Sequence, residues 1–188
     1  MNTEEYLKKI YVMLIAVLVI SVMSLLIGLV NYSNTSATTN DNAGKTETTT
    51  TNDYDVSMFN EVSISDILKF LGTKNSETHV LFLGRSSCSA CVAFLPSLRS
   101  AQSELKITAD YLDITKVDTD SSDFTKFTGY LSKTITQSVN GQEQTGKISE
   151  FYGLTPLVIV IKNGEAVDAI IGAYSKDNLL TFLKKYVD

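Results

Sequence analysis

A long apolar run close to the beginning of the chain is the first feature of its hydropathy pattern. Tyr11–Val30 is broken only by two serines and a glycine, and no charged residue occurs between Lys9 and Asp41. As a helix this run spans roughly 30 Å, about the thickness of a bilayer hydrocarbon core. It is longer than the roughly 7–15 apolar residues of a cleavable signal peptide. The pattern predicts an uncleaved transmembrane signal anchor over residues 10–30.

The lysines around this segment predict its orientation. Lys8 and Lys9 lie in the charged head, residues 1–9, and no Lys or Arg occurs in the 14 residues after the span. Because positive residues favour the cytoplasmic side, we expect a single-pass cell-membrane protein whose N-terminus is cytoplasmic and whose remainder is extracytoplasmic.

Residues 31–55 form a linker by composition, since 15 of the 25 are Thr, Asn or Ser. Such a segment buries too little apolar surface to offset its ordering entropy, so we expect a disordered tether. Residues 56–188 then form one domain, with 13 Lys and Arg against 15 Asp and Glu. This nearly neutral domain has no basic stripe, which argues against a nucleic-acid partner.

Periodicity within the domain predicts alternating helices and strands. Ser63–Gly72 has a helical apolar face with Ser65 as its N-cap, and His79–Gly84 is a continuous apolar run typical of a buried strand. A helix follows from Cys91, and Ala109–Asp118 alternates like a second strand.

The last part of the domain reads as two strands and a helix. Asn163-Gly164 is a strong hairpin signal, and Ser175 is suited to cap an amphipathic C-terminal helix. Between the two halves, an insert at about 119–146 predicts a helix with Phe124 and Phe127 on one face and a polar hairpin that turns at Asn140-Gly141. The fold class is α/β, with a βαβ unit followed by a ββα unit.

Both cysteines of the chain lie in the sequence Ser86–Cys91, as a C-x-x-C pair. The pair follows a predicted buried strand and opens a helix, whose free N–H groups and dipole stabilise a thiolate. Cys88, at the helix tip, is suited to attack as the nucleophile, and Cys91, one turn further, to resolve the mixed disulfide.

Two other interpretations of the pair are weaker. A zinc site needs about four ligands, and His79 is the chain's one histidine, so we expect no metal. A purely structural disulfide across so short a loop would constrain the unfolded chain little.

The chain resembles the thioredoxin superfamily over about 56–188. Pro96 lies eight residues after Cys88, as in that family, and Pro156 begins the penultimate strand. Lys162–Glu165 and Gly172 also follow the family spacing. The resemblance implies a thioredoxin-like fold, a central mixed sheet flanked by helices, after the N-terminal membrane helix.

The resemblance also implies site residues. The bond between Thr155 and Pro156 is expected to be cis and to face Cys88 and Cys91, with the Thr155 backbone available to a substrate chain. Arg85 is a candidate modulator of the thiolate. No cofactor is implied.

Departures from the thioredoxin pattern suggest a specialised relative. Ser87 replaces the usual Trp, Ser89-Ala90 replace Gly-Pro, and Phe82 replaces a buried acid. The anchor, the tether and the FLGRSSCSAC stretch are similar to the thioredoxin-like bacteriocin transport accessory proteins.

These features favour an extracytoplasmic thiol–disulfide oxidoreductase that acts on cysteines of exported peptides or proteins. Two alternatives stay open. One is a tethered, non-enzymatic module that binds a transporter or secretion partner, and the other is a reductase fed by a membrane redox partner.

Overall fold

The structure is a computed structural model that describes residues 54–74, 76–139 and 141–187. The predicted anchor at 10–30 and the linker up to residue 53 lie outside the described residues. Within the described ranges, no helix combines the length and the apolar character needed to cross a bilayer.

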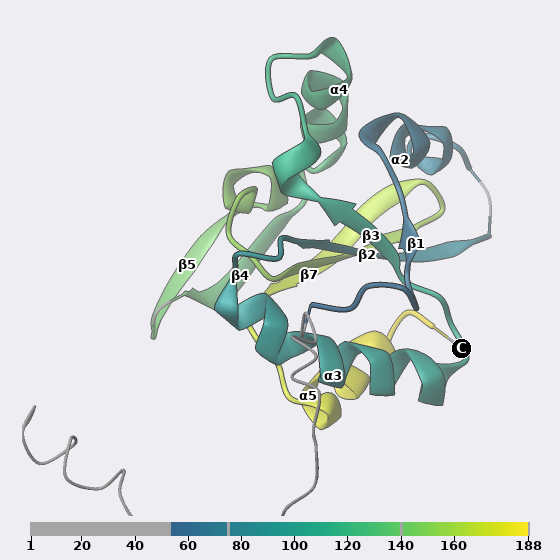
Figure 1. Cartoon of the computed structure of the whole chain (residues 1–188). Helices are drawn as coiled ribbons and strands as arrows, with labels where there is room; N and C mark the ends of the chain where they lie inside the picture. Colours follow the sequence, from purple (N-terminus) through teal and green to yellow (C-terminus); the bar gives the residue numbers. More distant parts are fainter. Residues whose placement is uncertain (1–53, 75, 140, 188) are drawn as a thin grey trace, which may run out of the picture. The chain divides into compact units, whose positions relative to one another are not determined.

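A five-stranded mixed sheet forms the centre of the described domain (Figure 1). Its order is β1-β3-β2-β6-β7. The three strands β1, β3 and β2 run parallel, whereas β6 is antiparallel to β2 and β7 is antiparallel to β6. The strands are β1 (Asn60–Glu61), β2 (Thr78–Gly84), β3 (Asp110–Asp113), β6 (Leu157–Lys162) and β7 (Glu165–Ile171).

Alternation along the strands divides the core between the two faces of this sheet. Val80 and Phe82 of β2 pack in one cluster with α3 (Ser89–Leu105) and α5 (Lys176–Leu183). Leu81 and Leu83 pack in the other with α2 (Ile64–Phe70) and α4 (Ser122–Tyr130). Figure 1 accordingly shows α3 and α5 on one side of the sheet and α2 and α4 on the other. The predicted α/β fold is confirmed, with a central mixed sheet flanked by helices and a βαβ unit followed by a ββα unit.

Two of the predicted boundaries are wrong. Ser63, not Ser65, is the N-cap of α2, because Ser63 and Asp66 form a reciprocal capping box. β3 ends at Asp113 instead of continuing to Asp118. The Asp113 side chain accepts a hydrogen bond from the Thr115 N–H at 3.0 Å and so turns the chain into the short 3₁₀ helix η1 (Ile114–Lys116).

The insert contains the elements that its pattern predicts. Phe127 is fully buried in α4, and β4 (Thr134–Val139) pairs with β5 (Gln142–Lys147) as a polar hairpin. The 3₁₀ helix η2 (Ile148–Phe151) then leads toward β6. The Gln137 side-chain amide donates to the Ala169 carbonyl at 2.9 Å, so this hairpin is attached to the outer edge of β7.

The β6–β7 turn shows why the Asn-Gly signal is reliable. Asn163 and Gly164 have φ of 54° and 78°, the left-handed region that a type I′ turn requires at both central positions. A Cβ at Gly164 would also lie 2.4 Å from the Thr73 carbonyl oxygen, so the backbone approach excludes a side chain there.

Two residues that the sequence assigns to the linker contact the domain. The Tyr54 hydroxyl donates to the Tyr111 hydroxyl at 3.0 Å, and Asp55 forms an ion pair with Arg99 of α3 at 3.2 Å. Gln102 extends this attachment by donating to the Met58 carbonyl at 3.0 Å. The end of the linker is therefore held against α3 and β3.

Candidate active site

The two cysteines lie at the tip of α3, immediately after the central strand β2. Because β2 ends at Gly84 and α3 begins at Ser89, Cys88 is the N-cap residue of the helix. Its Sγ accepts a hydrogen bond from the Cys91 backbone N–H at 3.1 Å. Cys88 is partly exposed, whereas Cys91 is 0% exposed. Only Cys88 can therefore meet another molecule in this arrangement.

The loop before β6 lies opposite the cysteines because β2 and β6 are antiparallel neighbours. Leu83 near the end of β2 pairs with Leu157 at the start of β6. The loop after β2 and the loop before β6 therefore lie at the same end of these strands. The Cys88 thiol donates to the Thr155 carbonyl at 3.4 Å. The bond between Thr155 and the buried Pro156 is cis, as predicted. The structure thus brings together residues 67 positions apart in the sequence.

The surroundings of Cys88 favour its thiolate. Burial opposes ionisation, but hydrogen bonds with Cys91 and the Thr155 side chain, the Cys91 N–H and the charge of Arg85 outweigh it, so the pKa of Cys88 is lowered. The contact from the thiol to the Thr155 carbonyl favours the protonated form and is lost when Cys88 ionises. Arg85 is half-buried in the loop between β2 and α3, where its charge contributes to this balance.

Cys91 has the opposite tendency. Burial, followed by its hydrogen bond with Cys88, raises its pKa to about 11. One turn of helix therefore separates an exposed thiol that ionises readily from a buried thiol that stays protonated.

An aromatic cluster occupies the core on the α3 side of β2. Phe82 is 0% exposed, and its ring centroid lies 5.8 Å from that of Phe94 and 5.4 Å from that of Tyr111. The position where the thioredoxin pattern has an acid is thus filled by tightly packed rings. Cys91 belongs to the same buried cluster.

The hydroxyls of Tyr54 and Tyr111 are further polar groups of this region. Burial raises the pKa of both phenols, that of Tyr111 to about 12, and a negative charge on Cys91 raises both further. Tyr54 was missed because it lies in a Thr- and Asn-rich stretch, and no periodicity marks it as part of the fold.

Leu154 adds exposed apolar surface to the loop whose next residue, Thr155, contacts Cys88. It directly precedes Thr155 and exposes 39% of its surface, unlike most large apolar residues of the domain. A leucine in a loop carries no sequence signal by itself, and its place follows only from the antiparallel pairing of β6 with β2.

His79 lies away from the cysteines, near the start of β2. Its Nδ1 is 3.1 Å from the Asp110 carboxylate, and its ring stacks on Phe70 at 3.9 Å. In the described part of the chain, no group of three or more His, Cys, Asp or Glu side chains is arranged to hold a metal ion.

Comparisons with known proteins give similarity at the level of the fold. A scan against protein-family models gives no match, and a search of curated proteins finds no similar sequence. Among solved structures, the chain is similar to the thioredoxin NaTrxh from Nicotiana alata, with 17% identity and a TM-score of 0.47 over 70% of this chain and 94% of that one. It is also similar to Fasciola hepatica thioredoxin, with 13% identity and a TM-score of 0.46 over 68% of this chain and 99% of that one. Both similarities are distant, with identities of 17% and 13%.

Proposed function

We propose that this protein is a thiol–disulfide oxidoreductase that exchanges a Cys88–Cys91 disulfide with cysteines of exported peptides or proteins. The observation that carries the proposal is the contrast between the two thiols at the tip of α3. Cys88 is accessible and has a lowered pKa, while Cys91 is buried, has a raised pKa and donates its backbone N–H to Cys88.

The reducing direction starts from the dithiol. The Cys88 thiolate attacks one sulfur of a substrate disulfide, so that a bond between Cys88 and the substrate forms as the substrate S–S bond breaks. The leaving substrate sulfur takes the electron pair and then a proton from solvent. Cys91 loses its proton and attacks Cys88, which forms the Cys88–Cys91 disulfide and releases the second substrate thiolate.

The oxidising direction is the reverse sequence. A substrate thiolate attacks Cys88 of the Cys88–Cys91 disulfide, and Cys91 leaves as a thiolate that takes up a proton. A second substrate thiolate then attacks the mixed disulfide, which leaves the substrate oxidised and the protein as a dithiol. Continued oxidation of substrate requires a partner that reoxidises this dithiol.

The proposal places the domain outside the cell membrane on a single N-terminal helix. The apolar run Tyr11–Val30 and the lysines before it support this placement. An extracytoplasmic location permits stable oxidation of cysteines. In this location, its partner would be a transporter or a membrane redox protein.

Trapping of substrates tests the chemistry. Cys91→Ser leaves the Cys88 nucleophile but removes the group that resolves the mixed disulfide, so it should accumulate mixed disulfides on non-reducing gels. Cys88→Ser should accumulate few. Equal trapping by both variants would contradict the assigned roles.

Protease accessibility tests the location separately. Protease added to intact spheroplasts should digest the domain at residues 56–188, and a cytoplasmic marker should stay intact. A protected domain would place the protein on the other side of the membrane.

A further inference from the structure

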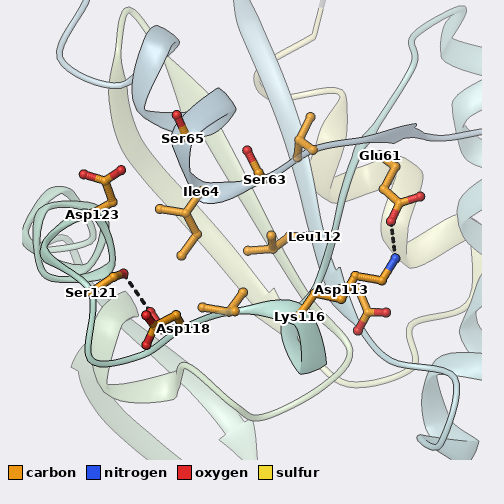
Figure 2. Close-up of a pocket in the computed structure, with 12 residues that line it drawn as sticks. Glu61, Ser63, Ile64, Ser65, Leu112, Asp113, Lys116, Asp118, Ser121 and Asp123 are labelled. Atoms are coloured by element: carbon orange, nitrogen blue, oxygen red, sulfur yellow. Dashed lines mark hydrogen bonds and ion pairs between the residues drawn. The ribbon is translucent and has the colours of Figure 1, made fainter.

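A hollow of about 380 Å³ lies between α2 and the start of α4, on the face of the sheet that α2 and α4 cover (Figure 2). Its walls are the carboxyl ends of β1 and β3, the first residues of α2, and the segment from η1 to α4. This volume is enough for two or three amino-acid side chains or a small ligand.

The floor of the hollow is apolar. Ile64 and Leu112 are nearly buried, and Val62 and Val117 are half-buried around them. Figure 2 shows Ile64 and Leu112 in the middle of the view, with the acidic residues around them. The floor therefore suits an aliphatic side chain.

The rim of the hollow is acidic. Glu61, Asp113, Asp118 and Asp123 line it, against the single cation Lys116. Lys116 is already engaged, because its Nζ lies 2.6 Å from the Glu61 carboxylate. Asp123 is also engaged, because its carboxylate forms an ion pair with Lys126 at 3.1 Å.

Asp113 and Asp118 form no direct ion pair with any described residue, although the charge of Asp113 acts on the nearby Lys116. One oxygen of Asp113 accepts hydrogen bonds from Thr115, and one oxygen of Asp118 accepts from the Asp120 N–H at 3.0 Å. These local bonds fix the two side chains and leave the second oxygen of each without a hydrogen bond from the described residues.

The hollow and the cysteines both lie at the carboxyl ends of the parallel strands. Asp113 ends β3 and pairs with Gly84, the last residue of β2, and Cys88 follows four residues later. Adjacent strands lie about 4.8 Å apart, and an extended chain advances about 3.3 Å per residue. Because Cys88 packs on the α3 face and the hollow lies on the α2 and α4 face, a peptide that reacts at Cys88 must pass over the carboxyl ends of β2 and β3. It would then reach the hollow with a residue roughly three to five positions from its cysteine.

We propose that this hollow binds a segment of the substrate that carries lysine or arginine beside an aliphatic residue, a few positions from the reacting cysteine. The inference rests on the proposed function, since it names the class of peptide that the same site prefers. The aliphatic side chain fills the floor, and the cation lies against Asp113 and Asp118. An anionic segment would be repelled by the carboxylates, which outnumber the cations around the hollow.

Exchange rates with matched peptides test this preference. Three synthetic peptides share one cysteine in a mixed disulfide with a chromophoric thiol and a Gly-Ser-Gly spacer, and differ in a Lys-Leu-Lys, Gln-Leu-Gln or Glu-Leu-Glu block after it. Each exposed ion pair adds a factor of about two to five in affinity. Two such pairs multiply, so the full chain should react with the Lys peptide about four- to 25-fold faster than with the Gln peptide, and slowest with the Glu peptide. Raising the salt concentration should reduce these ratios.

Two isosteric variants assign the preference to the hollow. Asp113→Asn and Asp118→Asn keep the side-chain oxygen that accepts the local hydrogen bonds but remove the charge. In the double variant the Lys-to-Gln rate ratio should fall to within about twofold of one. Asp120→Asn is the matched control, because Asp120 lies on the same loop but does not line the hollow, and its ratio should match that of the unmodified chain.

Three results would overturn the proposal. They are equal rates for the three peptides, a ratio insensitive to salt, and a ratio that the double variant retains. Failure of the proposed function is distinct, because then no peptide, whatever its charge, would release the chromophore faster than it does with Cys88→Ser.

Discussion

The Cys91 backbone N–H donates a hydrogen bond to the Cys88 sulfur at 3.1 Å, so the resolving residue also stabilises the nucleophile. This contact exists because Cys88 is the N-cap of α3, where unpaired N–H groups need an acceptor. A thiolate is a better acceptor than a thiol. The same bond that caps the helix therefore lowers the free energy of the charged form of Cys88.

Alkylation should detect this charged form directly. A free cysteine has a pKa of about 8.5. Because the pKa of Cys88 is lowered, its thiolate is populated at a lower pH than the thiolate of a free cysteine. The rate of iodoacetamide modification of the reduced protein should rise with pH and reach its plateau with a midpoint below that value. Cys91, buried and with a pKa of about 11, should stay unmodified at neutral pH in mass spectra.

The denatured protein is the control for this profile. In guanidinium chloride both cysteines should be modified with an ordinary midpoint. A folded profile that coincides with the denatured one would mean that the surroundings of Cys88 do not stabilise its thiolate.

Arg85→Gln should raise the pKa of Cys88, because it removes a positive charge that favours the thiolate. Arg85 is half-buried, so solvent screens the interaction, and we expect a small upward shift of the alkylation midpoint. Arg99 of α3 forms an ion pair with Asp55, so Arg99→Gln removes a different cation and should leave the midpoint in place. The role of Arg85 would be rejected if both variants behaved alike.

Phe82→Asp should cost roughly 3–5 kcal/mol of unfolding free energy, because it removes a fully buried ring and buries a carboxyl group. In the fraction that stays folded, the carboxylate should accept the proton of Cys91 and accelerate resolution of mixed disulfides. Denaturant unfolding and single-turnover reduction of a model disulfide measure the two effects.

Phe82→Leu separates these two consequences. It removes the ring without adding an acid, so it should destabilise the domain less and leave resolution slow. If the original chain already reduces insulin as fast as a conventional thioredoxin, Phe82 does not limit the reducing direction.

Shortening the β4–β5 hairpin should slow exchange with peptide substrates more than exchange with a small disulfide. The hairpin contacts the segment after β7 through Gln137 and Tyr174, and β7 ends at the same edge as the cysteines, where Gly172 donates to the Pro156 carbonyl at 2.8 Å. Replacing residues 136–145 with a short Gly-Ser loop retains the buried Ile135. Equal rates for both substrate sizes would indicate a tolerated surface insertion.

The sequence predicts the site best where chemistry and local geometry coincide. Cys88 and Cys91 are recognisable because a C-x-x-C pair must follow a strand and open a helix to be useful. Pro156 is recognisable through the resemblance to the thioredoxin superfamily, and in the structure it directly precedes β6. Thr155 approaches Cys88 only because β2 pairs with β6. The resemblance predicts this proximity, whereas local periodicity does not.

Errors in the fold have local causes that compete with periodicity. Apolar alternation continues past Asp113, but its side chain bonds to Thr115 and ends the strand. Ser65 and Ser63 are both acceptable caps by residue type, and Asp66 decides between them through the reciprocal bond. The acidic hollow depends on three segments that only the fold brings together.

The bond from Gln137 to the Ala169 carbonyl has a consequence for how copies of this protein meet one another. β7 is an edge strand of the sheet, and an edge strand invites a second chain to add alongside it. The hairpin occupies a backbone acceptor on that edge, and the opposite edge, β1, is just two residues long. The row of free backbone groups is therefore interrupted at Ala169 on one border and is short on the other, so both borders are weaker templates for a second copy than a long uninterrupted edge strand.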